Sequence, residues 1–160
     1  TTFTVELPLV WTEAVPASPS AKQQPKAVSL KGVPVLLAED NDLNAEITTM
    51  LLEKEGMVVT RAADGEQVVE IFKNAPAGAF AVILMDIMMP KLDGYAAAQA
   101  IRTLEGRADG RTIPIIALSA NVFAEDIEAS KAAGMDAHLS KPLEVSKLIA
   151  AISRLYKSRE

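Results

Sequence analysis

From about residue 30 onward, short apolar runs alternate with amphipathic stretches along the chain. This alternation is typical of repeated strand–helix–strand units that build a parallel sheet. Crossovers between parallel strands are right-handed, so the helices are expected to cover both faces of one doubly wound α/β sheet. The apolar runs predict five strands, at about Val33–Ala38, Val58–Ala62, Ala79–Met85, Ile113–Leu118 and Ala137–Leu139.

The stretches between these runs carry helix signals. Asp64 is placed to cap the second helix, with Gln67 able to reach back as in a capping box. A third helix is expected to begin near Asp93, and a fourth spans about Ala124 to Ala133. The first helix has an apolar stripe of the kind that faces a core, formed by Leu43, Ile47, Met50 and Leu51. The last helix has a second such stripe, formed by Val145, Leu148, Ile149, Ile152 and Leu155.

The first thirty residues have a different pattern. Residues 1–9 alternate apolar and polar side chains, the period of a half-buried strand. Residues 10–30 are rich in Pro, Ala, Ser, Lys and Gln, and such a composition buries too little apolar surface to offset chain entropy. We therefore expect a short strand at 1–9, a flexible linker at 10–30 and one globular domain at 31–160.

Composition narrows the function classes. The 160 residues include 49% hydrophobic residues, enough for a core, and carry a formal net charge of −5. This charge argues against nucleic acid as a partner, because phosphate backbones select clustered Lys and Arg. There is no cysteine, and no apolar stretch reaches the roughly 20 residues of a membrane span. The N-terminus lacks a secretory signal, so we expect a cytoplasmic fragment of a longer protein with no direct membrane contact.

Polar residues stand where the predicted strands end. Asp86 ends the third apolar run, Glu39 and Asp40 follow the first, Ser119 follows the fourth, and Lys141 follows the fifth. Ligands of open α/β sheets bind outside the carboxyl ends of the strands, so these groups are expected to converge. Acids, a hydroxyl and an ammonium at one edge predict a site for a phosphoryl group and a divalent metal.

The three acids favour Mg²⁺. Glu39, Asp40 and Asp86 would repel one another unless a cation shared them, and hard oxygen ligands select Mg²⁺, Ca²⁺ or Mn²⁺. Mg²⁺ commonly uses one or two carboxylates together with phosphate and water. The alternative is that Asp40 or Asn41 simply caps the first helix. Gly-rich phosphate loops are absent, which disfavours nucleotide binding.

The other candidates also have ordinary alternatives. The bond between Lys141 and Pro142 can adopt the cis form, and the ammonium could neutralise a phosphoryl group. A lysine in this position is more often solvated, ahead of a proline that starts a helix. Ser119 could donate to a phosphoryl oxygen or serve in a turn. His138 is the single histidine, so a two-histidine site is impossible within this chain.

Four segments together resemble the receiver domain of two-component response regulators over about residues 31–157. The resemblance implies a flavodoxin-like five-stranded parallel sheet of order 2-1-3-4-5 with five helices. It implies that Asp86 is the phosphoacceptor and that Glu39, Asp40 and the main-chain carbonyl of Met88 help to hold Mg²⁺. The segments are Leu37-Ala38-Glu39-Asp40-Asn41, Leu84-Met85-Asp86-Ile87-Met88-Met89-Pro90-Lys91-Leu92-Asp93-Gly94, Ala117-Leu118-Ser119-Ala120 and Ser140-Lys141-Pro142.

The same resemblance implies that Ser119 is the switch hydroxyl and that Lys141 contacts the phosphate. His138 stands where the family usually has a Tyr or Phe that reports phosphorylation. Residues 1–9 are similar to the closing strand of a histidine-kinase ATP-binding domain. The chain is therefore expected to come from the C-terminal end of a hybrid sensor histidine kinase. Whether that parent kinase is anchored in a membrane stays open.

These features predict a phosphorelay receiver that takes a phosphoryl group from phosphohistidine onto Asp86 and then changes conformation. The expected partners are the kinase's dimerisation and phosphohistidine domain and a histidine phosphotransfer protein. The fragment would have only self-phosphorylation and self-dephosphorylation chemistry. One rival is a degenerate receiver that serves as an interaction module, although Asp86 and Lys141 are both present. The other is an aspartyl-nucleophile phosphatase, which usually has an acid where this chain has Met88.

Overall fold

The computed structural model describes residues 29–120 and 123–157. The predicted strand at 1–9 and residues 10–28 of the predicted linker lie outside the described residues. Leu30 is buried and packs with the core. No helix in the described part of the chain is long and apolar enough to cross a membrane.

Five parallel strands form one sheet in the order β2-β1-β3-β4-β5, which confirms the flavodoxin-like prediction. Helices connect the strands, and a short 3₁₀ helix, η1, precedes β4. The strands are β1 Pro34–Ala38, β2 Val58–Ala62, β3 Val82–Asp86, β4 Ile115–Ser119 and β5 Ala137–Ser140. The helices are α1 Asp42–Lys54, α2 Gly65–Asn74, α3 Gly94–Thr103, η1 Ala108–Arg111, α4 Ala124–Ala132 and α5 Val145–Lys157.

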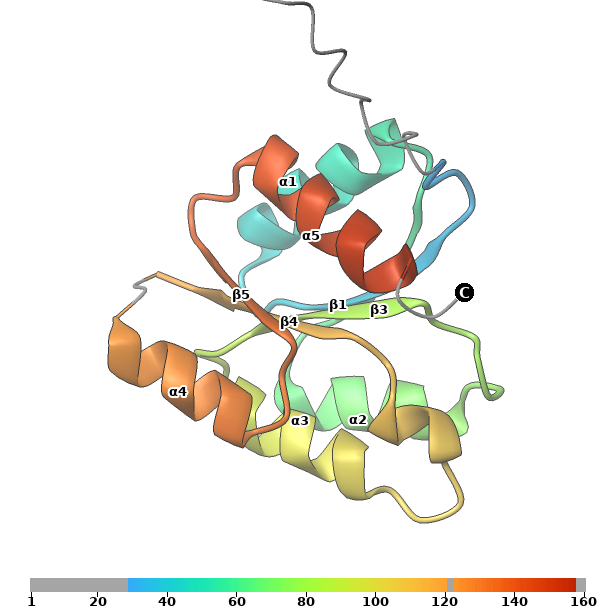
Figure 1. Ribbon diagram of the computed structural model, residues 1–160, viewed down its shortest axis with the longest axis vertical. Helices are drawn as coiled ribbons and strands as arrows, with labels where there is room; N and C mark the ends of the chain where they lie inside the picture. The colour runs from blue at the N-terminus through green and yellow to red at the C-terminus, as the bar shows by residue number, and fades with distance from the viewer. Residues whose placement is uncertain (1–28, 121–122, 158–160) are drawn as a thin grey trace, which may run out of the picture.

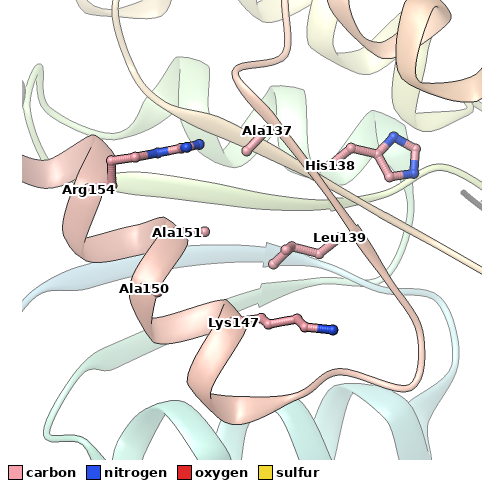
Figure 2. Close-up of a pocket in the computed structure, with 7 residues that line it drawn as sticks. All are labelled: Ala137, His138, Leu139, Lys147, Ala150, Ala151 and Arg154. Carbon is pink, nitrogen blue, oxygen red and sulfur yellow. The ribbon is translucent and has the colours of Figure 1, made fainter. Parts of the chain in front are cut away.

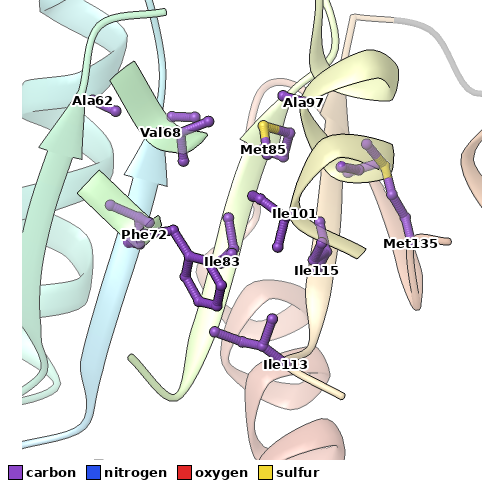
Figure 3. Close-up of a cluster of buried hydrophobic side chains, with 14 of the residues drawn as sticks. Ala62, Val68, Phe72, Ile83, Met85, Ala97, Ile101, Ile113, Ile115 and Met135 are labelled. Carbon is purple, nitrogen blue, oxygen red and sulfur yellow. The ribbon is translucent and has the colours of Figure 1, made fainter. Parts of the chain in front are cut away.

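Helices cover both faces of the sheet, with α1 and α5 on one side and α2, α3 and α4 on the other (Figure 1). Successive residues of a strand point to opposite faces, so each central strand supplies both layers. In β1, Leu36 packs toward α2 and α3, whereas Leu37 packs toward α1 and α5. Figure 3 shows the first of these two cores, in which Phe72 and Ile101 meet Ile83 of β3.

The apolar stripe expected to bury α1 was assigned to the wrong face. Leu43, Ile47 and Met50 are 64%, 48% and 63% exposed. The helix instead packs through a second stripe at helical spacing, Ala45, Thr48 and Leu52. Periodicity cannot rank two stripes on one helix, and the small residues at 45 and 48 allow close approach to the sheet. Leu43, Ile47 and Met50 therefore form an exposed apolar surface, which is called the α1 patch below.

At the amino-terminal end of the sheet, arginines hold the connecting loops. Arg107 donates to the carbonyl oxygens of Phe72, Lys73 and Ala75 at the end of α2, and its guanidinium lies 4.3 Å from the centroid of the Phe72 ring. It also forms two hydrogen bonds of 2.9 Å with Asp109. These contacts lower the pKa of Asp109 well below its ordinary range.

Arg102, at the end of α3, fastens the neighbouring loops in the same way. Its guanidinium donates to the carbonyl oxygens of Gly134, Gly110 and Ile113. It also pairs with Asp136 at 2.9 Å. The loops before β4 and β5 are therefore fixed to the end of α3, and this end of the sheet is closed by backbone hydrogen bonds.

Candidate functional site

The residues predicted at the strand ends converge at the carboxyl edge of the sheet. Glu39 follows β1, Asp86 ends β3, Ser119 ends β4 and Lys141 follows β5. These four strands are neighbours in the order β1, β3, β4, β5, so residues separated by about a hundred positions share one edge. Glu39, Asp86 and Ser119 are nearly buried. A polar group placed there must find partners, because an unpaired buried charge is costly.

Lys141 is the common partner of two acids. Its Nζ lies 2.6 Å from Oδ2 of Asp86 and 2.5 Å from Oε2 of Glu39. Burial of the ammonium works to lower the pKa of Lys141, but the hydrogen bonds and charges of Asp86 and Glu39 outweigh it and hold that pKa above its ordinary value. The ordinary alternative, a solvated lysine, is wrong because the side chain is only 20% exposed. The bond from Lys141 to Pro142 is cis.

Asn41, rather than Asp40, caps α1. The Asn41 side chain accepts a hydrogen bond of 3.0 Å from the backbone N–H of Asn44. The Asp40 carboxylate belongs instead to a group of three acids, Glu39, Asp40 and Asp86. One carboxylate oxygen from each acid lies within 4.8 Å of the other two. Mg²⁺ holds oxygen ligands at about 2.1 Å, so opposite ligands stand about 4.2 Å apart. The donor type and spacing therefore fit Mg²⁺.

Two residues that sequence reasoning missed support Glu39. Arg61 of β2 donates to the main-chain oxygen of Glu39 through Nε and one terminal nitrogen. Asn44 of α1 donates from its amide to Oε1 of Glu39 at 3.2 Å. Helix-capping patterns explain Asn41 but give no signal for these contacts, which depend on how β2 and α1 meet. The Glu39 carboxylate is held from two sides, by Asn44 and by Lys141.

The loop between β3 and α3 is packed tightly against the end of β3. The backbone N–H of Met88 donates to Oδ1 of Asp86 at 3.1 Å, which keeps this loop beside the acid. Gly94 is required at the start of α3, because a Cβ there would lie 2.2 Å from the main-chain oxygen of Asp86. The role of the Met88 carbonyl as a metal ligand stays a prediction.

A further contact, unforeseen from the sequence, ties this loop to α2. Lys91 has a φ of 64° and pairs with Asp64 at 2.6 Å. Asp64 also caps α2 by accepting from the backbone N–H of Gln67, as predicted, while the Gln67 side chain accepts from the backbone N–H of Ala63. The hydrogen bond from Lys91 lowers the pKa of Asp64 below its ordinary value.

Ser119 and His138 are in contact. Oγ of Ser119 lies 2.6 Å from Nε2 of His138, and Oγ of Ser130 on α4 lies 2.9 Å from Nδ1 of the same ring. Ser119 is the last residue of β4 and is buried there. No sequence pattern pointed to Ser130, because its position depends on how α4 packs beside β5.

Residues 35–153 match the family model described as the response regulator receiver domain. The protein belongs to this receiver family. The receiver is 39% identical over 122 residues to the peroxide stress-activated histidine kinase mak1 of Schizosaccharomyces pombe, a match that covers 76% of this chain. The chain spans only 7% of the length of mak1. The part of mak1 that matches is therefore a small region of a much longer histidine kinase.

Solved structures agree with the receiver fold. One is the receiver domain of sensor histidine kinase PA1611 from Pseudomonas aeruginosa PAO1, with a magnesium ion coordinated in its active-site cleft. It is 37% identical, covers 79% of this chain and 98% of its own, and has a TM-score of 0.70. Another is the receiver domain of Ssk1 from Saccharomyces cerevisiae, in complex with the histidine phosphotransfer protein Ypd1. It is 26% identical, covers 81% of this chain and 92% of its own, and also has a TM-score of 0.70.

Proposed function

We propose that this receiver accepts a phosphoryl group from phosphohistidine onto Asp86, within a hybrid histidine kinase. One observation carries the proposal: the ammonium of Lys141 lies between the carboxylates of Asp86 and Glu39. A carboxylate accepts about four hydrogen bonds. Among the described residues, Met88 donates to one oxygen of Asp86 and Lys141 donates to the other. Lone pairs of Asp86 are therefore left to attack phosphorus.

The transfer involves two reacting groups, the Asp86 carboxylate and the phosphohistidine of the donor. An oxygen of Asp86 forms a bond to phosphorus as the bond between phosphorus and the histidine nitrogen breaks, and the electron pair of that bond leaves with the imidazole. Lys141 is placed to follow the transferred charge, because its ammonium already contacts the Asp86 carboxylate. Ser119 supplies a hydroxyl from the next strand. Catalysis of this kind depends on positioning and electrostatic stabilisation.

The residues that would hold Mg²⁺ are Glu39, Asp40 and Asp86, with the carbonyl of Met88. When bound, the ion would neutralise charge on the phosphoryl oxygens. The acid cluster and the magnesium-bound structure of the PA1611 receiver support this assignment. The phosphatase alternative gains no support, because Met88 stands where a second acid would be needed.

The partner surface is proposed at the α1 patch. Leu43, Ile47 and Met50 are exposed on the helix that begins beside Glu39 and Asp40. A pocket lined by Ile47 on α1 is also lined by Lys141, the lysine that pairs with Asp86 and Glu39. An apolar helix face next to the phosphoacceptor suits docking of a helical phosphohistidine domain. Candidate donors are the dimerisation domain of the parent kinase and a phosphotransfer protein of the kind seen with Ssk1.

The phosphoacceptor is tested with a small donor. The protein is incubated with Mg²⁺ and acetyl phosphate, and its intact mass is measured. We expect a single acid-labile phosphoryl adduct, which is lost in Asp86→Asn and without Mg²⁺. Asp93→Asn is the matched control, because Asp93 is an exposed helix cap in the same loop and Asn caps equally well. An adduct that persists in Asp86→Asn would overturn the assignment.

The docking surface is tested with a protein donor. Phosphorylated Ypd1 serves as the probe, and transfer is compared with the reaction of acetyl phosphate. Ile47→Glu is expected to slow transfer from the protein by about tenfold or more, as loss of an interface anchor does, while the reaction with acetyl phosphate is unchanged. Val58→Glu is the control, because Val58 is exposed on β2 at the amino-terminal end of the sheet. Equal losses in both reactions of Ile47→Glu would contradict docking at the α1 patch.

A further inference from the structure

The residues proposed to hold Mg²⁺ beside Asp86 lie on two separate loops. Glu39 and Asp40 belong to the loop between β1 and α1, and Met88 belongs to the loop between β3 and α3. Mg²⁺ demands near-octahedral geometry at about 2.1 Å, so its affinity is sensitive to small shifts of its ligands. Groups that fix these two loops relative to one another are therefore expected to influence Mg²⁺ binding.

Arg61 of β2 fixes the first loop. Its Nε and one terminal nitrogen lie 3.3 Å and 3.2 Å from the main-chain oxygen of Glu39. The same terminal nitrogen lies 2.7 Å from Oδ1 of Asp42 at the start of α1. A guanidinium presents its donors in a rigid fork, so these contacts hold the backbone of Glu39 in one position relative to α1.

Asp64, three residues further along the chain, fixes the second loop. Its Oδ2 accepts a hydrogen bond of 2.6 Å from Lys91, a residue of that loop. Its Oδ1 accepts from the backbone N–H of Gln67 and caps α2. Because Asp64 is nearly buried and held at the helix end, the ion pair attaches the loop to a fixed point.

The second loop also rests directly on the start of α2. A Cβ on Gly65 would lie 2.0 Å from the main-chain oxygen of Leu92, so backbone meets backbone there with no side chain between. Nearer its start, the loop is held to β3 by the hydrogen bond from the backbone N–H of Met88 to Asp86. The loop is thus attached to β3 on one side of Met88 and to α2 on the other.

We propose that residues 61–65, which join β2 to α2, position both magnesium-binding loops, with Arg61 and Asp64 as the positioning residues. The inference rests on the proposed function and concerns the metal site of that function. Neither residue belongs to the proposed ligand set. Arg61 acts through the main chain of Glu39, and Asp64 acts through Lys91 on the second loop.

Charge and position make opposite predictions for two side chains. Arg61 and Lys91 are cations on or beside the two loops, so if only their charge mattered, removing either would strengthen the binding of Mg²⁺. If they position the loops, removing either should weaken it, because groups that orient metal ligands typically change metal affinity by about 10- to 100-fold. The direction of the change separates the two explanations.

Mg²⁺ affinity is measured directly, by titrating MgCl₂ into metal-free protein labelled with ¹⁵N and following the amide signals of residues 86–88 by NMR. We expect the dissociation constant to rise about tenfold in Arg61→Met. Arg61→Lys keeps the charge and loses the fork, so it should also bind Mg²⁺ more weakly than the unaltered protein. Unchanged or tighter binding in Arg61→Met would overturn the proposal.

The ion pair is tested with single and double variants. Lys91→Asn, whose new residue tolerates a positive φ, and Asp64→Asn, which keeps the helix cap, should each weaken Mg²⁺ binding by about two- to fivefold, the size an exposed pair supports. Both lose the same interaction, so the double variant should bind no more weakly than Asp64→Asn. Tighter binding in Lys91→Asn, or full affinity in the double variant, would show that charge alone acts.

Lys147→Asn is the matched control. Lys147 lies on α5 beside β5 (Figure 2) and pairs with Glu144, so its loss removes an exposed lysine and an ion pair without touching either loop. We expect its affinity for Mg²⁺ to equal that of the unaltered protein. An equal loss of affinity in Lys147→Asn and Lys91→Asn would contradict the positioning role.

A rate measurement separates positioning from general damage. Adduct formation from acetyl phosphate is followed by intact mass over a range of Mg²⁺ concentrations, and urea unfolding in EDTA shows that each variant is folded. The positioning variants should need more Mg²⁺ for half of the maximal rate and reach the maximal rate of the unaltered protein. A lower maximal rate at an unchanged Mg²⁺ requirement would count against the proposal.

The outcomes distinguish this inference from the proposed function. If the unaltered protein binds no Mg²⁺ or forms no adduct, the proposed function fails and the positioning role fails with it. If the unaltered protein does both and the variants bind Mg²⁺ equally well, only the positioning role fails. Lys91 is more than half exposed, so Lys91→Asn decides the question even if Arg61→Met does not fold.

Discussion

The two ends of the sheet hold their charges in different ways. At the amino-terminal end, Arg102 and Arg107 donate to main-chain carbonyl oxygens of loops and helix ends and pair with one aspartate each. At the carboxyl end, Lys141 is shared by Glu39 and Asp86. A planar guanidinium suits several fixed carbonyl groups, whereas an ammonium acts as a compact charge that can follow a moving partner.

This difference separates stability from chemistry. The arginines use their donors on backbone groups whose positions are set by the fold, so removing one leaves buried acceptors unpaired. The acids at the carboxyl end keep lone pairs that no hydrogen bond from the described residues fills, and these lone pairs suit a metal or a phosphoryl group. The contrast predicts that substitutions at one end change folding, while those at the other change phosphoryl acceptance.

The largest expected effect is on the reaction. Lys141→Met should slow adduct formation from acetyl phosphate by about 100-fold or more, because it removes a positioned charge from the transition state. Lys147→Met is the matched control, since Lys147 is exposed and pairs with Glu144 on the surface. Rates are measured by intact mass over time. If Lys141→Met reacted as fast as the control, the carboxyl end of the sheet would not differ from the amino-terminal end in its effect on the reaction.

The next effect is on stability. Arg107→Met should lower the free energy of unfolding by about 3 kcal/mol, because the carbonyl groups at the end of α2 and the Asp109 carboxylate lose their partner. Urea unfolding measures this change, with Arg111→Met, an exposed arginine of the same loop, as the control. Adduct formation at Asp86 should be unchanged in folded Arg107→Met. A variant as stable as the control would show that these hydrogen bonds contribute little.

A smaller effect depends on pH. The pKa of Asp109 is lowered in the folded protein by the hydrogen bond from Arg107, so the unfolded chain binds more protons between the two pKa values. Stability from this group is present above about pH 4 and lost as pH falls below it, by about 2 kcal/mol. Urea unfolding between neutral and acid pH should show a shallower decline in Asp109→Asn. If stability declined equally with falling pH in both proteins, the Arg107–Asp109 pair would not be its cause.

The smallest effect concerns a second lysine pair at the carboxyl end. Lys91 is more than half exposed in its pair with Asp64, so its loss should lower stability only slightly. Because residue 91 has a positive φ, Lys91→Gly should be more stable than Lys91→Ala, which keeps the backbone strain without the ion pair. Unfolding curves of the two variants decide this. The reverse order would show that residue 91 does not hold this conformation in solution.

Much of the fold followed from local patterns. Runs such as those in β1 and β4 are buried on both faces, so continuous apolar sequence was a direct signal. Strand ends also predicted where Asp86 and Lys141 would stand, because parallel strands share a carboxyl edge. The start of β3 was placed three residues early, at Ala79 rather than Val82, since the apolar run continues into the preceding loop.

The sequence by itself determined which chemical groups reach the carboxyl edge of the sheet, because strand order and chain direction place them there. Only the tertiary structure decided how they pair. It gave Lys141 two acids, left Asp40 free of the α1 cap and joined Ser130 to Ser119 through His138. The tertiary structure also decided which face of α1 is exposed, because burial depends on which stripe fits the sheet and not on periodicity alone.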